Sequence, residues 1–204
     1  DFSLSVNKSA DFLASYGLLV KEELEKVNEG SLRVLEIGSP RFDQYRNEAI
    51  IEKTKNNLRK RLDIDAGRPV LLYVATDIVL GQTYDTYSMR RLFKNISAVT
   101  DKIEKLQVIV KIRGPAREIF FRQSLREAFG EKCSIAQYEN IHELISISDI
   151  VASSFSTVAL ETMIARKPLI LVGLDKNDLM LLESHFLPYE KDGCVKIARN
   201  EKDL

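Results

Sequence analysis

A regular alternation of short apolar runs with segments of helical period is the feature that most constrains how this chain can fold. The runs at 70–74 and 169–172 are apolar at consecutive positions, which is typical of strands buried on both faces of a sheet. Strands are expected at residues 32–37, 70–75, 107–112, 133–137, 149–153, 169–172 and 194–198. With right-handed crossovers, this alternation predicts an α/β fold, with a doubly wound, mostly parallel, Rossmann-like sheet and helices on both faces.

The segments between the strands carry the apolar spacing of amphipathic helices. Ser88 is a candidate N-cap for a helix that continues to Glu104. Pro115 suits the first turn of the following helix, and Gly130 is placed to end it. Further helices are expected at residues 9–16, 42–61, 141–147 and 157–166. Residues 77–87 are interpreted as a loop at the carboxyl edge of the sheet, where open α/β sheets bind ligands.

Composition and charge exclude several classes of function. The 30 basic and 30 acidic residues balance, so no global field attracts nucleic acid, and no nucleic-acid partner is expected. The two cysteines, Cys133 and Cys194, lack metal-ligand spacing, which favours a reducing cytoplasm. No apolar run approaches the ~18 residues that span a bilayer. Asp63-Ile64-Asp65 is interpreted as a turn, so no metal site is expected there. No cofactor is expected either.

The segment from Ser153 to Glu161 carries the most chemical information, because a hydroxyl-rich turn there joins a buried strand to a helix. Exposed N–H groups and the positive end of the dipole make a helix start a site for anions. Ser153, Ser154, Ser156 and Thr157 can add hydroxyl donors to phosphate oxygens. Glu161 follows about one turn later, where a carboxylate can accept hydrogen bonds from ribose hydroxyls. The alternative is that Ser156 only caps the helix and Glu161 only complements its dipole.

Two other strand ends add candidate binding groups. Lys111 and Arg113 place positive charge where it suits a pyrophosphate, although a solvated strand end is the alternative interpretation. Lys111 lies in an otherwise apolar strand and therefore needs a partner. Tyr138 and Ile141, at the next strand-to-helix turn, are candidates for contact with a base. His142 is interpreted as a first-turn surface residue, because the sequence identifies no acid or nucleophile as its partner.

Several of these segments occur together in a pattern. A Ser148-Asp149 pair precedes a strand, the hydroxyl-rich turn and Glu161 follow, and Lys167-Pro168 precedes the next strand. In this order they resemble the donor-binding half of the GT-B glycosyltransferase superfamily. The resemblance extends to surface-polysaccharide enzymes, including relatives of the glycerophosphotransferases and polysialyltransferases, and to nucleotide-sugar 2-epimerases.

Two further segments support the resemblance. Residues 38–43, Gly-Ser-Pro-Arg-Phe-Asp, resemble the crossing from the acceptor domain to the donor domain in these families. Residues 111–115 resemble their Lys-x-His-Pro stretch, but Arg113 stands at the histidine position and Gly114 intervenes before Pro115.

The resemblance implies one half of a GT-B fold. Residues 41–204 would form the nucleotide-sugar donor domain, and residues 1–40 the terminal strand-helix-strand and crossing segment of a mostly absent N-terminal domain. Thr76 and the turn would hold the nucleotide diphosphate, Glu161 the ribose, and the loop from Tyr138 to Ile141 the base. A glycan or lipid-linked acceptor would bind the N-terminal domain, and no catalytic residue is identified in this chain. The expected location is the cytoplasm, with the inner face of the membrane as an alternative for the parent protein.

These implications lead to a main hypothesis and two alternatives. The main hypothesis is metal-independent group transfer from a nucleotide-activated sugar, in which the helix start and Lys111 or Arg113 stabilise the departing diphosphate. A nucleotide-sugar 2-epimerase shares the donor half but needs acid/base carboxylates and histidines that this sequence does not clearly supply. A non-catalytic flavodoxin-like or receiver-like module belongs to another class, and bound flavin would colour the protein yellow. A receiver domain also needs acidic residues at strand ends, where residues 111–113 instead place positive charge.

Overall fold

The computed structural model describes residues 11–28, 33–46, 48–76, 78–79, 82–83, 86–113, 118–173, 176–200 and 202–204. The chain divides into two compact units, Asp1–Arg46 and Asn47–Leu204. The division falls after Arg46, whereas the sequence predicts a domain boundary between residues 40 and 41. The assignment of the units to acceptor and donor domains stays a prediction.

The first unit contains two parallel strands joined by a helix. β1 (Phe12–Ser15) pairs with β2 (Arg33–Glu36), and α1 (Leu18–Asn28) lies between them in the sequence. A 3-10 helix, η1, follows at Pro40–Arg46. The helix expected at 9–16 is wrong where the structure describes it, because residues 12–15 pair with β2 instead. Pairing buries Ser15, whose hydroxyl donates to the Leu35 carbonyl, and this tertiary contact overrides the local helical pattern.

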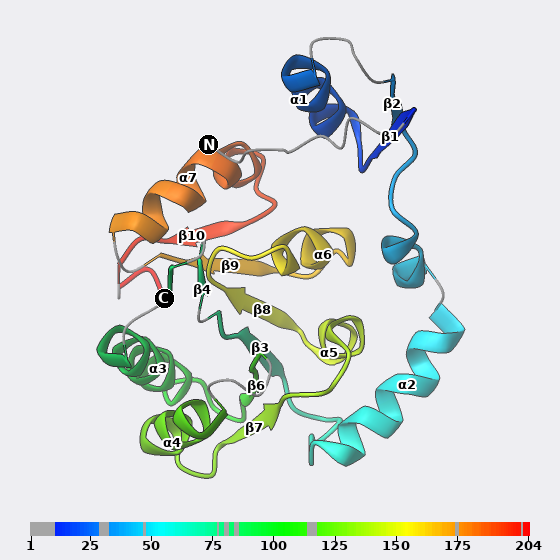
Figure 1. The fold of residues 1–204 in the computed structure, drawn as a ribbon. Coiled ribbons are helices and arrows are strands. Elements are labelled where there is room, and N and C mark those ends of the chain that lie inside the picture. Colours follow the sequence, from blue (N-terminus) through cyan, green and yellow to red (C-terminus); the bar gives the residue numbers. More distant parts are fainter. Residues whose placement is uncertain are drawn as a thin grey trace. The chain divides into compact units, whose positions relative to one another are not determined.

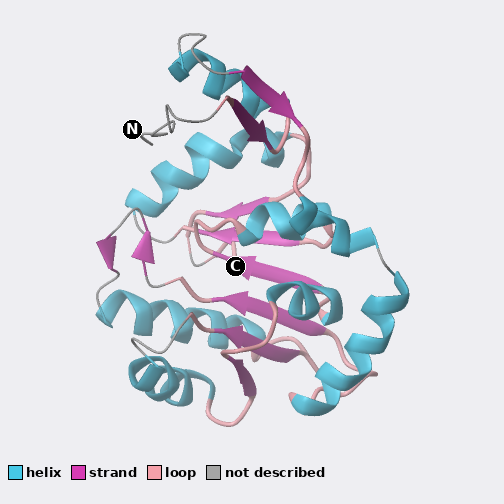
Figure 2. Ribbon diagram, turned by 45° about the vertical axis from the view of Figure 1, so that its right-hand side comes forward, coloured by secondary structure: helices cyan, strands magenta, loops and turns pink. Residues whose placement is uncertain are grey.

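The second unit is built on a six-stranded parallel sheet, which confirms the predicted doubly wound α/β fold (Figure 2). Its strands are β3 (Val70–Val74), β6 (Gln107–Lys111), β7 (Cys133–Ala136), β8 (Ile150–Ser153), β9 (Leu169–Val172) and β10 (Lys196–Ala198). Their order is β10-β9-β8-β3-β6-β7, and every neighbouring pair is parallel. Each expected strand of this unit is present within a residue or two of its predicted bounds.

Helices cover both faces of this sheet. They are α2 (Glu48–Arg61), α3 (Thr86–Thr100), α4 (Glu118–Phe129), α5 (Ile141–Ile147), α6 (Val158–Ile164) and α7 (Lys176–Lys191). Figure 1 shows α3 and α4 on one side of the sheet and α5 and α6 on the other. The helix expected at 42–61 is divided into η1 and α2. None of the described helices is long and apolar enough to span a membrane.

Several helix ends differ from the prediction. α3 begins at Thr86, so Ser88 lies inside the helix and is not its N-cap. It ends at Thr100 rather than at Glu104, because the chain turns there and Lys105 adopts a left-handed φ of 64°. Gly130 follows α4 with a φ of 61°, which confirms that it ends this helix. Pro115 lies outside the described residues.

Two elements were not expected from the sequence. β4 (Ile78–Val79) and β5 (Gln82–Thr83) form a short antiparallel pair within the segment predicted to be a loop. The helix α7 was not expected either. Its buried positions are Asp178, Leu182 and Phe186, so an acidic residue interrupts the apolar pattern, and Pro188 lies inside the helix.

The core on the α3/α4 face is built around aromatic side chains. Tyr73 of β3 meets Phe93 of α3 edge-on, with ring centroids 6.1 Å apart. Phe93 in turn contacts Phe121 of α4, also at 6.1 Å. All three rings are fully buried. This packing fixes β3, the central strand, against both helices and so holds the carboxyl edge of the sheet in place.

Candidate functional site

The carboxyl ends of β3 and β8 lie side by side at the point where the strand order reverses. From β3 the chain proceeds outward through β6 and β7, and then returns to β8 on the other side of β3. Val74 of β3 is in register with Ser153 of β8. In open α/β sheets, ligands bind in the crevice outside such a switch point. The structure therefore brings Thr76, which follows β3, next to the hydroxyl-rich turn that follows β8.

The hydroxyl-bearing residues of the turn at 153–157 differ in their exposure to solvent. Ser153 and Ser154 are buried, whereas Ser156 is half-buried and Thr157 is exposed. Ser156 accepts a hydrogen bond from the Val158 amide at 3.3 Å, and the N-cap Thr157 makes no side-chain cap bond. The Ser153 hydroxyl is buried without a hydrogen-bond partner among the described residues, which is rare for a polar group. Ser156 and Thr157 are thus the hydroxyls of this turn nearest to solvent.

The helix after the turn is short. α6 has seven residues, so its dipole contributes less to anion binding than a long helix would. The turn is instead held by aromatic packing from α7. The Phe155 ring meets His185 at 5.0 Å and Phe186 at 6.1 Å between ring centroids. Hydroxyl and backbone N–H groups of a fixed turn, rather than the dipole, are therefore the main feature of this segment.

Lys111 links the end of β6 to the start of the loop that follows β7. Its ammonium donates to the Gln137 carbonyl oxygen, which supplies the partner that the sequence required. Burial lowers the pKa of Lys111, and the nearby Glu139 carboxylate acts in the opposite direction. Lys111 and Ser153 both lie in register with Val74, on opposite sides of it, which places them about two strand spacings or ~10 Å apart. Arg113 is exposed beyond the strand. Their predicted contact with a pyrophosphate stays a prediction.

Gln137, the residue before the loop at 138–140, is held by two hydrogen bonds to α4. The Gln137 side chain donates to Glu118 at 2.9 Å and accepts from Arg122 at 3.0 Å, which joins the end of β7 to α4. Tyr138 then projects into solvent with 81% of its surface exposed. Asn140 caps α5 by accepting from the His142 amide at 2.9 Å. An exposed ring on a fixed backbone is suited to stack on a base, but this role stays a prediction for Tyr138, as it does for the half-buried Ile141.

Glu161 and His142 form a contact that was not predicted from the sequence. His142 Nδ1 lies 3.2 Å from Glu161 Oε2, with the side chains only 12% and 2% exposed respectively. The interpretation of His142 as a surface residue without an acidic partner is therefore wrong. The two residues are far apart in the sequence and meet because α5 and α6 both start at the carboxyl edge and lie next to each other. The ribose contact of Glu161 stays a prediction.

Comparison with known proteins assigns the chain to a family. Residues 3–204 match the family model described as CDP-glycerol:poly(glycerophosphate) glycerophosphotransferase. The chain belongs to this family.

A curated relative is the teichoic acid ribitol-phosphate polymerase TarL of Staphylococcus aureus (strain NCTC 8325 / PS 47), 23% identical over 171 residues. That alignment covers 82% of this chain and 29% of TarL. A second polymerase of the same strain, TarK, is 22% identical, with 82% of this chain and 32% of TarK covered. The chain thus spans about a third of the curated relatives that it matches.

Solved structures support the fold of this glycerophosphotransferase-family chain. A variant of the wall teichoic acid polymerase TagF superposes with a TM-score of 0.63 at 18% identity, over 94% of this chain and 46% of that one. A structure of UDP-N-acetylglucosamine 2-epimerase gives a TM-score of 0.61 at 14% identity, over 95% of this chain and 47% of that one. These likenesses are at the level of the fold. They confirm the predicted GT-B, Rossmann-like domain.

Asp149 and Lys167, two residues of the pattern that resembles the GT-B families, make hydrogen bonds that stabilise the structure around the site. The Asp149 carboxylate accepts from the Val70 amide at 2.8 Å and so joins β8 to β3. The Lys167 ammonium donates to the Ser148 carbonyl at 2.7 Å, at the end of α5. Burial lowers the pKa of Lys167. These contacts lie at the amino edge of the sheet, away from the turn at 153–157.

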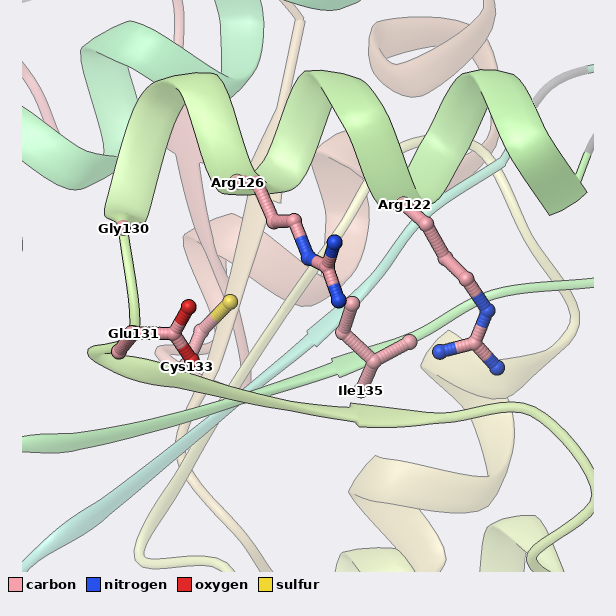
Figure 3. A pocket seen from close by; sticks show the side chains of 6 residues that line it. All are labelled: Arg122, Arg126, Gly130, Glu131, Cys133 and Ile135. Atoms are coloured by element: carbon pink, nitrogen blue, oxygen red, sulfur yellow. The ribbon is translucent and has the colours of Figure 1, made fainter.

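A pocket of about 220 Å³ lies elsewhere, between α4 and the edge strand β7 (Figure 3). It is lined by Arg122, Arg126, Gly130, Glu131, Cys133 and Ile135. Arg122 is already engaged by Glu118 at 2.7 Å. Burial raises the pKa of Cys133 to about 11, so its thiol is protonated at neutral pH and is a poor nucleophile. This pocket does not contain any of the predicted site residues.

The described residues contain no group of three or more His, Cys, Asp or Glu side chains placed to hold a metal ion. Asp63-Ile64-Asp65 lies in the turn after α2, as predicted. Asp63 has a φ of 54°, and the Asp65 carboxylate accepts from the Gly67 amide.

Proposed function

We propose that this chain is the donor-binding part of a transferase that moves a polyol phosphate or glycosyl group from a nucleotide-activated donor to a growing surface polymer. The family description names CDP-glycerol and poly(glycerophosphate). The S. aureus relatives are named ribitol-phosphate polymerases, and a TagF variant was soaked with CDPG. A CDP-linked polyol is therefore the first donor to test, ahead of the UDP-linked sugars.

The observation that carries this proposal is the switch point between β3 and β8. Thr76 and the turn at 153–157 flank it, and the exposed Tyr138 follows β7, which is two strands from β3 and three strands from β8, or about 10–14 Å along the same edge. In the proposed mode, the turn and Thr76 bind the two phosphates. The loop from Tyr138 to Ile141 contacts the base, and the ribose lies between them, near Glu161. Lys111 and Arg113 add positive charge beside the phosphates.

The proposed chemistry is electrostatic. Transfer of glycerol phosphate from CDP-glycerol breaks the bond between the two phosphates, so CMP departs rather than a diphosphate. Donor groups around the phosphates would stabilise the charge that develops on the departing CMP. We propose that this needs no metal ion. The acceptor, a glycan or a lipid-linked chain, and the base that deprotonates it would belong to the N-terminal part of the enzyme. A cytoplasmic location at the inner face of the membrane would suit a lipid-linked acceptor.

The test is a calorimetric titration with CDP-glycerol, CDP, UDP, GDP and UDP-N-acetylglucosamine, with and without EDTA. The probe variant is Thr157→Glu, because Thr157 is exposed and a carboxylate there would face the phosphates. A carboxylate about 5 Å from a phosphate charge costs about 3 kcal/mol at an effective dielectric of about 20, and less at an exposed site. We therefore expect at least about tenfold weaker binding. Asn57→Glu, an exposed change on α2, adds the same charge away from the switch point and serves as the control.

Saturable binding of CDP-glycerol that is insensitive to EDTA and is weakened only by Thr157→Glu would support the proposal. Tighter binding of UDP-N-acetylglucosamine than of CDP-glycerol would favour the epimerase alternative. Absence of binding to any nucleotide by the folded chain would contradict the proposal for this chain.

A further inference from the structure

The contact between His142 and Glu161 joins two helices at the carboxyl edge. His142 is in the first turn of α5, immediately after the loop from Tyr138 to Ile141, and Glu161 is in the first turn of α6. The two side chains meet at 3.2 Å between Nδ1 and Oε2. The imidazole therefore lies between the segment proposed for the base and the segment proposed for the phosphates. In a nucleoside diphosphate, the ribose occupies that position.

The two partners differ in their access to a ligand. The Glu161 side chain is 2% exposed and that of His142 is 12% exposed, so the carboxylate is the deeper of the two. A carboxylate that is this deeply buried needs a hydrogen-bonding partner, and the imidazole supplies one. A carboxylate bonded to Nδ1 of a histidine also fixes the orientation and the tautomer of the ring. Glu161 therefore holds the His142 imidazole in one orientation from its more buried side.

We infer that His142 is the residue of this pair that meets the donor, through a ribose hydroxyl, and that Glu161 acts on the donor through His142 by orienting its imidazole. The inference rests on the proposed function, because it requires that a nucleotide binds at the switch point. It reverses the roles that the pattern around Glu161 predicts. Glu161 becomes a positioning residue, and His142 distinguishes ribose from deoxyribose.

The test compares CDP with 2′-deoxy-CDP and 3′-deoxy-CDP by calorimetry on the full chain. One hydrogen bond to a hydroxyl corresponds to about a tenfold preference for CDP over one of the deoxy analogues. In His142→Gln, the side-chain amide can still donate to Glu161 and keep the carboxylate paired, but the imidazole is gone. In Glu161→Gln, the amide oxygen can still accept from Nδ1 and hold the ring. Circular dichroism checks that both variants are folded.

We expect the tenfold preference to fall to within about twofold in His142→Gln and to persist in Glu161→Gln. A purely structural role for His142 would not produce this pair of results. If the preference persists in His142→Gln, or is lost in Glu161→Gln, the inference is wrong. If the wild-type chain binds CDP without any preference for the ribose hydroxyls, the inference fails while the proposed function stands. If the wild-type chain binds no nucleotide, both fail.

Discussion

The substitution Gly173→Ala tests how tightly α7 is packed against the end of β9. Gly173 is buried, and an added Cβ would lie 2.9 Å from Leu179 Cδ2 and 2.9 Å from Leu182 Cδ1. Ordinary contacts between carbon atoms are about 3.5–4.0 Å, so each side chain must retreat by at least about 0.6 Å. Leu179 is half-buried and can move, but Leu182 is fully buried and must displace its neighbours.

The expected magnitude follows from this geometry. Overpacking a core by a methyl group costs about 1–3 kcal/mol, and the lower entropy of unfolded alanine offsets about 0.4–1 kcal/mol. We expect the free energy of unfolding to fall by about 1–2 kcal/mol. For a unit of this size, that lowers the melting temperature by about 5 °C.

Thermal and urea unfolding followed by circular dichroism measure this loss. The control is Gly67→Ala, in an exposed turn where the nearest atom to an added Cβ is Asp65 Oδ1 at 3.6 Å. That change should stay within about 0.5 kcal/mol of the wild type. Leu182→Val should restore part of the stability of Gly173→Ala, because the two sites share the crowded space. Equal stability of Gly173→Ala and Gly67→Ala would refute the reasoning.

Two further predictions concern stability. Asp149→Ala removes the acceptor of the buried Val70 amide and should lower the free energy of unfolding by about 1–2 kcal/mol, whereas Asp149→Asn should lose less than half as much in urea unfolding. Hydrogen bonds from Gln137 and then Arg122 lower the pKa of Glu118 below the ordinary value for a glutamate. The stabilisation from Glu118 is therefore fully present above the ordinary pKa of a glutamate, and it is lost as the pH falls through the lowered pKa. The difference in melting temperature between the wild type and Glu118→Gln should therefore shrink as the pH is lowered from neutral through that range. A difference that is constant with pH would count against this role of Glu118.

The sheet could be predicted from the sequence because its strands are buried on both faces. Consecutive apolar residues at Val70–Val74 and Leu169–Val172 leave few alternatives to a central parallel strand. The sequence pattern was misleading where tertiary contacts determine the secondary structure. Residues 12–15 form β1 because they pair with β2, and α7 was missed because Asp178 occupies one of its buried positions.

The candidate site was predictable in its location but not in its contacts. Parallel strands bring their carboxyl ends to one edge, so Thr76, Lys111 and the turn at 153–157 could be placed there from the sequence. The pairing of His142 with Glu161 depends on the packing of α5 beside α6, which no local pattern reveals. A usable signal was present, however, since both residues lie in the first turns of successive helices.

The most direct test of the donor-site account is hydrogen–deuterium exchange of the chain with and without saturating CDP-glycerol. The account predicts slower exchange in peptides that cover residues 138–142 and 153–161, on the two sides of the switch point. Protection confined to the pocket between α4 and β7, which Arg122 and Arg126 line, or no protection anywhere in the folded chain, would contradict it.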